Sequence, residues 1–311
     1  MDIVLMCPSG LATGGTEGIH NLASTLNKVG AHAKVLYIGQ GSKQKPEEFN
    51  KYECEGIEEL PKNYKGAIIF PEVWGNQVID PRYRDNIVAI NWQGVDVYDW
   101  HTPKWDRCLY LKRGDTIHIA NSEYAVAHLT KQGINPIKIS DCLNDVFYDL
   151  TWDLANRKNT VLYNPIKIKH ILLQDTVIAR CNTELGIRFC PIEGLTRNEV
   201  IQTFKTHKLY IDFGYFSGRE RLPREAVMCG CCIITNSMGT AGYFEDNSIY
   251  DKYKVDDVSS AMHMIGYVLS NYTSCVSDFN QYRDLLKRDK DNYIEEVRRL
   301  YNAFLNHNSG T

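Results

Sequence analysis

The sequence lacks long apolar runs and has no marked excess of charge of either sign. Its 35 Lys and Arg residues stand against 38 Asp and Glu residues, so the formal net charge is -3. A protein that holds duplex nucleic acid usually presents a basic stripe or arm, so this balance argues against DNA or RNA as the dominant partner. No stretch approaches the ~18 apolar residues that a membrane-spanning helix needs. We therefore expect a soluble protein, with peripheral membrane contact at most.

Motifs for metal binding and for serine hydrolysis are also missing. The 9 histidines show neither the HxH nor the HExxH spacing, and the cysteine-rich stretch 229–232 has no second pair at zinc-finger spacing. No Gly-x-Ser-x-Gly sequence supplies the nucleophile of an α/β-hydrolase. We therefore expect no metal and no cofactor, only substrates.

Cysteine usage and the first residues bear on location. The 10 cysteines are scattered along the chain, which is typical of reduced thiols in a cytoplasm. Residues 1–6 do not combine a basic region with a long apolar run, as an export signal would. We therefore expect a cytoplasmic protein.

Short apolar, β-branched runs alternate with longer segments of helical periodicity, and this alternation occurs twice. Such a pattern is typical of βα units and mainly parallel sheets. The expected strands are 2–6, 33–38, 66–70, 87–91, 108–111, 116–120, 160–163, 187–190, 209–213 and 231–235. The expected helices are 16–29, 122–132, 167–183, 196–206, 224–229 and 257–270. The sequence therefore predicts an α/β protein.

Two segments mark the domain organisation. The stretch 145–158 loses apolar periodicity and gains Asp, Asn and Arg, as a linker does, so we place one domain at 1–152 and a second at 153–285. The charged segment 277–306 carries one narrow apolar stripe at helical spacing. Its members are Ile294, Val297, Tyr301 and Phe304. We expect the final segment, 286–311, to be a helix that packs back on the first domain.

A glycine-rich segment, 8–18, follows the first expected strand and opens a helix. Gly14 and Gly15 let the backbone approach a ligand closely, and the amides at a helix N-terminus, here near Thr16, attract an anion. The segment is neither a Walker loop nor a Gly-x-Gly-x-x-Gly motif. A tight βα turn explains the glycines equally well, because every doubly wound domain has such turns.

The segment 209–235 concentrates ionisable residues after a buried strand. They are Arg219, Glu220, Arg221, Arg224 and Glu225. Strand, loop, helix and strand follow one another, which places these side chains at the carboxyl end of a parallel sheet, where α/β proteins bind ligands. Guanidinium groups suit a diphosphate, and carboxylates suit sugar or ribose hydroxyls. A surface network of Arg and Glu is the alternative, but the charges lie beside an apolar strand rather than along a solvated helix face.

Other expected strand ends carry polar or aromatic residues. In the second half these are Tyr163, Asn164 and Lys167, which could reach a phosphate, and Gly239 and Thr240, which offer backbone amides. In the first half they are Glu72, Trp74, Trp92 and Asp96. Trp faces stack on sugars, so this second set is interpreted as an acceptor site, although a Trp at such a place is more often partly core.

Together these segments resemble the GT-B glycosyltransferases. The likeness rests on Gly14–Leu22, on 163–167, on 189–196, and on 210–214 continuing through Arg221–Ala226 to 239–241. It is most specific at 160–255, weaker over 40–110, and best matches small enzymes of bacterial surface-polysaccharide clusters.

The resemblance implies two Rossmann-like domains that face each other across a cleft. The second would bind a nucleotide-diphosphate sugar without metal, and the first an acceptor. By position, Glu225 matches the glutamate that holds the donor ribose. Lys167, with Arg219 or Arg221, matches the residues that neutralise the diphosphate, and Gly14 and Gly15 match the glycine loop of the first domain.

One departure leaves the stereochemistry open. Related retaining enzymes space two glutamates with seven residues between them, which would place the first at Ser217, whereas the nearby acid is Glu220. A retaining reaction remains favoured over an inverting one, with Arg219, Glu220 and Glu225 as the catalytic set. We expect transfer of a sugar to a glycan, a lipid-linked precursor or another hydroxyl acceptor. A hydroxylated DNA base as acceptor, or a non-catalytic nucleotide-sugar-binding subunit, are the alternatives.

Overall fold

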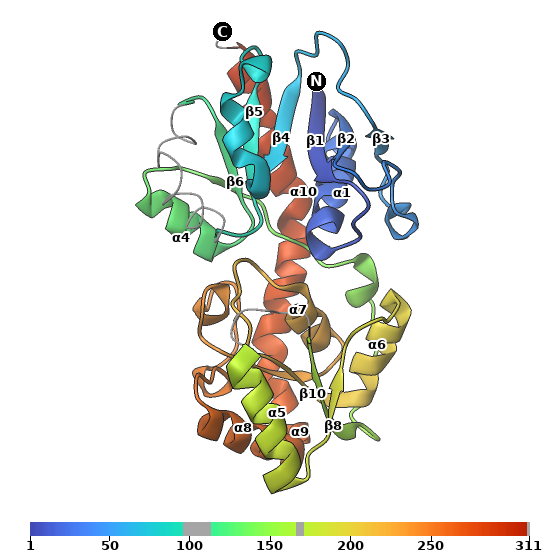
Figure 1. Cartoon of the computed structure of the whole chain (residues 1–311), viewed down its shortest axis with the longest axis vertical. Helices are drawn as coiled ribbons and strands as arrows, with labels where there is room; N and C mark the ends of the chain where they lie inside the picture. Colours follow the sequence, from blue (N-terminus) through green and yellow to red (C-terminus); the bar gives the residue numbers. More distant parts are fainter. Residues whose placement is uncertain (96–112, 166–170, 310–311) are drawn as a thin grey trace. The chain divides into compact units, whose positions relative to one another are not determined.

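The computed structural model describes residues 1–95, 113–165 and 171–309. The chain divides into two compact units (Figure 1). The first unit comprises Met1–Cys142 and Lys290–Thr311, and the second comprises Leu143–Asp289. Within the described residues, no helix is long and apolar enough to cross a membrane.

The first unit is built on a parallel sheet of seven strands in the order β3-β2-β1-β4-β5-β6-β7. The strands are β1 (Asp2–Pro8), β2 (His32–Ile38), β3 (Glu55–Ile57), β4 (Ala67–Pro71), β5 (Val88–Trp92), β6 (Ile117–Ala120) and β7 (Ile137–Lys138). Strands β4 and β5 are buried along their whole length, which explains their nearly continuous apolar sequence.

Apolar side chains cover both faces of this sheet. On one face, α1 (Gly14–Lys28) and the C-terminal part of α10 (Asn280–Ser309) pack through Leu22, Leu26, Val297 and Phe304. On the other face, α4 (Glu123–Lys131) contributes Ala125 and Leu129 to a second cluster. The sheet thus lies between two packed layers, which hold its strands and their carboxyl ends in place.

The second unit has a parallel sheet of four strands in the order β11-β10-β8-β9. The strands are β8 (Lys158–Tyr163), β9 (Phe189–Pro191), β10 (His207–Asp212) and β11 (Cys232–Thr235). The helices are α5 (Ile171–Leu185), α6 (Arg197–Thr206), α7 (Arg221–Met228), α8 (Val258–Ser270), α9 (Tyr272–Cys275) and the first part of α10. One continuous apolar core joins this sheet to its helices.

The division between the units differs in detail from the linker expected from the sequence. Leu143 and Phe147 are buried in the core of the second unit, so the segment before residue 153 belongs there. At the other end, Ile294 of α10 is 41% exposed and lies outside the buried stripe. The stripe instead runs through Tyr293, Val297, Leu300 and Phe304.

The α/β class and the parallel sheets predicted from the sequence are confirmed. Two short strands, β3 and β7, were not predicted. The expected strand at 108–111 lies outside the described residues. Helix α6 begins as its sequence indicates, because Thr196 and Glu199 form a reciprocal capping box.

Candidate functional site

The second unit brings its strand-following loops together at one edge of the sheet. Strands β8, β9, β10 and β11 are parallel, so their carboxyl ends at Tyr163, Pro191, Asp212 and Thr235 share that edge. The loop after β10 is 213–220, and it leads directly into α7. Of the residues that the sequence singled out in the second half, those that the structure describes lie at or next to this edge.

Buried side chains fix the start of the 213–220 loop. Asp212 is 1% exposed, and its carboxylate accepts hydrogen bonds from the amide of Gly214 at 3.1 Å and the hydroxyl of Tyr210 at 2.8 Å. From the loop after β11, the side-chain amide of Asn236 donates to the carbonyls of Phe213 and Gly214 at 2.7 and 3.1 Å. The loop is therefore held in place before any ligand binds.

Gly239 is required where the two loops meet. Its φ is 63° and its ψ is -138°, a conformation that essentially only glycine adopts. A Cβ at this position would lie 2.1 Å from the carbonyl oxygen of Phe216, and the next amide, of Thr240, donates to that same oxygen at 2.9 Å. The hydroxyl oxygen of Thr240 is itself buried and has no hydrogen-bond partner in the described part of the chain. Gly239 thus serves a close backbone contact, beside a polar atom that remains unsatisfied.

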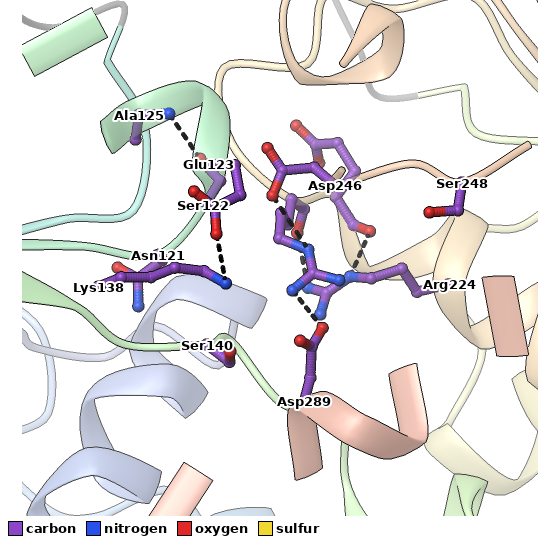
Figure 2. Close-up of polar contacts among 12 residues, drawn as sticks. Asn121, Ser122, Glu123, Ala125, Lys138, Ser140, Arg224, Asp246, Ser248 and Asp289 are labelled. Atoms are coloured by element: carbon purple, nitrogen blue, oxygen red, sulfur yellow. Dashed lines mark hydrogen bonds and ion pairs between the residues drawn. The ribbon is translucent and has the colours of Figure 1, made fainter. Parts of the chain in front are cut away.

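Two of the three arginines predicted for the donor site, Arg219 and Arg224, are buried among protein groups. Arg224 donates from Nε to the carbonyl of Glu220 at 3.0 Å and from Nη2 to that of Arg219 at 2.6 Å. Nη1 of Arg219 lies 2.5 Å from Oδ2 of Asp289, and its Nε lies 3.9 Å from Oδ1 of Asp246. Figure 2 shows the carboxylates of Asp246 and Asp289 pointing toward the guanidinium groups between them. Both arginines therefore order the loop that precedes α7.

The charge of Arg219 is compensated inside the protein. Burial disfavours its charged form, but the Asp289 carboxylate, with Tyr282 and Asp246, outweighs this effect and raises the pKa of Arg219 above its ordinary value. Within the described residues, its Nε and Nη2 atoms are buried without hydrogen-bond partners. Arg219 therefore keeps two donor nitrogens for a further acceptor, while its positive charge is already matched by two carboxylates.

Glu225 has a partner that the sequence did not reveal. Its side chain is 1% exposed, and Oε1 lies 2.5 Å from Nη1 of Arg197, the first residue of α6. Because Arg197 is 28 residues earlier in the chain, spacing gives no sign of the pair. The same holds for Asp246 and Asp289 beside Arg219. Glu220 and Arg221, at the start of α7, are half-buried.

The remaining predicted donor residues lie at the same edge or outside the described residues. Tyr163 ends β8, and its ring and that of Phe189 form a T-shaped pair with an angle of 70° between the ring planes. The carbonyl of Asn164 accepts a hydrogen bond from the side chain of Gln174 at 3.0 Å. Lys167 lies outside the described residues. Thus Tyr163 and Asn164 join the site, with Gly239 and Thr240.

In the first unit, the glycine segment forms the N-terminus of α1. Thr13 is the N-cap, and Thr16 completes a capping box with it, so the hydroxyl of Thr16 serves the helix. The side chain of Gln93, from the loop after β5, donates to the carbonyl of Gly15 at 2.9 Å. A Cβ on Gly15 would lie 2.9 Å from Oε1 of Gln93. Gly15 therefore leaves room for the side chain of Gln93, which comes from the loop after a neighbouring strand.

The residues predicted to bind an acceptor are not equivalent in the structure. Glu72 accepts a hydrogen bond from the amide of Gln93 at 3.4 Å and is half-buried, as is Trp74. Trp92 is 0% exposed, and its indole N–H donates to Nδ1 of His118 at 3.0 Å. Trp92 therefore belongs to the core and presents no face to an acceptor. Asp96 lies outside the described residues.

Polar residues that the sequence did not single out lie at the carboxyl ends of β5 and β6. Asn91 and Asn121 are both buried at the carboxyl ends of these neighbouring strands. One strand further along, Lys138 pairs with Glu123 at 2.9 Å, in the first turn of α4 (Figure 2). Within the described residues, no group of three or more His, Cys, Asp or Glu side chains is placed to hold a metal ion.

Comparison with solved structures identifies the fold. The chain is similar to sucrose-phosphate synthase from Thermosynechococcus elongatus, with a TM-score of 0.71 and 12% identity over 97% of this chain and 98% of that one. It is also similar to an alpha-glucosyltransferase in complex with UDP and a 13-mer DNA, with a TM-score of 0.60 and 10% identity over 97% and 100%. A third is the catalytic domain of starch synthase IV from Arabidopsis thaliana bound to ADP and acarbose, with a TM-score of 0.57 and 11% identity over 99% of each.

At sequence level there is no such match, since no protein-family model and no curated protein matches this chain. The structural likeness, by contrast, extends over nearly the full length of the chain and of the three solved structures. It agrees with two units that each combine a parallel sheet with helices. The chain therefore has the GT-B fold of glycosyltransferases.

Proposed function

We propose that this chain is a glycosyltransferase that moves a sugar from a nucleotide-diphosphate sugar to a hydroxyl acceptor. The observation that carries the proposal is the buried polar edge of the second sheet, where Glu225, Arg219 and Thr240 lie around pre-ordered loops. In the GT-B fold this edge has the position expected of a donor site. The solved structures support a nucleotide ligand, because two of them contain UDP or ADP.

The second unit supplies groups for both parts of such a donor. The buried carboxylate of Glu225 accepts hydrogen bonds, which suits ribose hydroxyls. Arg219 keeps two donor nitrogens, Nε and Nη2, whose N–H groups suit oxygens of the diphosphate or of the sugar. Since its charge is already compensated, we assign neutralisation of the leaving diphosphate mainly to Arg221 and Lys167, assisted by the N-terminus of α7.

Metal independence and a retaining outcome are parts of the proposal. Cationic side chains at this edge take the place of a divalent ion. Glu220, half-buried at the end of the 213–220 loop, stays in the proposed catalytic set with Arg219 and Glu225. We propose a cytoplasmic enzyme that extends a glycan or its lipid-linked precursor.

A DNA base is the alternative acceptor, and one specific observation favours it. The alpha-glucosyltransferase solved with UDP and DNA matches 97% of this chain over its own full length. The net charge of -3 disfavours duplex DNA as the main partner. A glycan acceptor is therefore our first choice, and hydroxymethylated DNA is the second.

Turnover of the donor tests the proposal. The full chain is incubated in EDTA with UDP-, ADP- and GDP-sugars, with and without oligosaccharides or hydroxymethylated DNA, and the released nucleoside diphosphate is quantified. Release that increases with one acceptor class supports the proposal, and proton NMR of the product gives the anomeric configuration. Nucleotide-sugar binding without any release would instead identify a non-catalytic binding subunit.

A further inference from the structure

Two asparagines at the carboxyl edge of the first sheet share one face. Asn91 lies in β5 opposite Ile119 of β6, and Asn121 follows β6 directly. Residues in register on parallel strands point to the same face, and so do residues two apart on one strand. The amide of Asn121 donates to the carbonyl of Trp92 at 3.2 Å and so continues the ladder one residue past the end of β6. Asn91, Ile119 and Asn121 therefore point to one face. It is the face of Ala89 and Ile119, which is covered by α1 and α10.

The amide of Asn121 is oriented by one hydrogen bond and leaves its oxygen unpaired. Nδ2 donates to the carbonyl of Ile139 at 3.2 Å, so turning the amide over would place two acceptors against each other. With the amide so fixed, Oδ1 is buried and has no hydrogen-bond partner among the described residues. Asn121 thus presents a buried acceptor whose direction is set by the fold.

Asn91 has the same property. It is 3% exposed, and its Oδ1 is buried with no hydrogen-bond partner in the ranges that the structure describes. Exchanging the oxygen and nitrogen of this amide would only replace an unpaired acceptor by an unpaired donor. An apolar side chain of similar size would avoid this cost, so two such residues at one sheet edge indicate a role outside stability.

The surroundings suit a neutral, hydroxyl-bearing ligand. Lys138 and Glu123, a charged pair at this edge, lie 2.9 Å apart and compensate each other. Gln93 points to the same face by its spacing from Asn91, and it reaches the N-terminus of α1 at Gly15. Amide oxygens accept hydrogen bonds from hydroxyl groups without requiring charge on the ligand. Sugars carry several hydroxyls in fixed directions.

We propose that Asn91 and Asn121 form a hydroxyl-binding subsite that takes two hydroxyl groups of a sugar. The choice of a sugar rests on the proposed function. The hydroxyls belong either to the transferred sugar of the donor or to the acceptor, and the experiment below separates these sources.

The test combines stability and binding in the substitution Asn91→Leu. Because Leu removes a buried unpaired acceptor and keeps the same branched arrangement of heavy atoms, the melting temperature of the ligand-free variant should stay equal or rise by about 2–4 °C. The matched control is Asn86→Leu. Asn86 is a buried asparagine of the same unit, but its Nδ2 donates to the carbonyls of Tyr64 and Gly66 at 2.8 and 3.0 Å. This control should lose several degrees.

The binding arm uses defined probes. Calorimetry compares UDP and ADP with UDP-glucose and ADP-glucose, and then free mono- and disaccharides in the presence of saturating UDP or ADP. In Asn91→Leu and Asn121→Ala, we expect sugar-dependent affinity to fall about tenfold or more while affinity for the bare nucleotide is unchanged. Loss for the nucleotide sugars assigns the hydroxyls to the donor, and loss for the free saccharides assigns them to the acceptor.

A lower melting temperature for Asn91→Leu, together with unchanged sugar affinity, would overturn the subsite and make Asn91 a structural residue satisfied by water. The stability arm needs no turnover. Failure of wild-type protein to release nucleotide therefore counts against the proposed function and not against the subsite.

Discussion

Nη1 of Arg219 lies 2.5 Å from Oδ2 of Asp289, and the two side chains are 2% and 8% exposed. Arg219 belongs to the loop that precedes α7, and Asp289 belongs to α10. Asp289 is the last residue of the second unit, and the same helix continues into the first unit from Lys290. The contact therefore ties the proposed donor loop to the helix that connects the units.

Substitution of Asp289 should be strongly destabilising. Asp289→Asn leaves the buried guanidinium of Arg219 with Asp246 as its remaining carboxylate partner, and breaking a buried pair costs about 3–5 kcal/mol. Urea unfolding measures the loss. The control is Asp284→Asn, an exposed position of the same helix, which should change stability by less than about 0.5 kcal/mol. Equal effects of the two substitutions would show that the Arg219–Asp289 pair does not hold the loop.

Glu225→Gln should weaken donor binding and keep the fold. The amide oxygen of Gln still accepts from Arg197, whereas the charge that strengthens hydrogen bonds to ribose hydroxyls is lost. A loss of about 1.5–3 kcal/mol corresponds to roughly ten- to hundredfold weaker nucleotide binding. Isothermal calorimetry is the measurement, with the exposed Glu193→Gln as control. Unchanged nucleotide affinity in a destabilised Glu225→Gln protein would assign Glu225 to structure alone.

Gly239→Ala should lower stability by more than the cost of its left-handed backbone conformation alone. The matched control is Gly186→Ala, because Gly186 has a similar φ of 64°. A Cβ added at Gly186 would meet no atom within 4 Å, whereas a Cβ added at Gly239 would lie 2.1 Å from the carbonyl oxygen of Phe216. The control should cost about 1–2 kcal/mol from the left-handed conformation. Gly239→Ala should cost more and abolish nucleotide binding. Thermal unfolding with and without UDP compares the pair, and equal losses would refute a close contact at Gly239.

The free energy of unfolding should decrease as the pH is lowered below about 6.5, because His118 is buried in its neutral form. Nδ1 of His118 accepts from Trp92, and burial lowers the pKa of His118 to about 4. Between these values the unfolded chain binds a proton that the folded chain does not, so stability rises with pH by up to about 1.4 kcal/mol per unit for this group. His118→Gln should reduce the slope of unfolding free energy against pH between 5 and 6.5 by that amount. An unchanged slope would contradict a neutral buried His118.

The fold was readable from the sequence because apolar runs such as those of β4 and β5 record burial on both faces. The short strand β3 was missed because only Ile57 of its three residues is apolar. The sequence points to the edge where we propose that the donor binds, because Arg219, Arg224 and Glu225 follow a buried strand. Their partners were not found, since Asp289 meets Arg219 only through the tertiary fold.

The same limit applies in the first unit. Tryptophan is a residue type that often stacks on sugars, and Trp92 lies at a strand end. Alternation along β5, however, turns its ring into the core and points Asn91 to the opposite face. Sequence composition directs attention to this strand end. It did not distinguish the two faces of the sheet, because the packing of α1 and α10 against one of them is a long-range property.

Hydrogen exchange of the full chain with and without UDP or ADP, in EDTA, tests most directly that the carboxyl edge of the second sheet binds the donor. The account predicts increased protection of the backbone amides in 213–226 and 239–247, with little change at the amino ends of β8 and β10. Protection that requires added Mg²⁺ or Mn²⁺, or that leaves these two segments unchanged while nucleotide is bound, would contradict it.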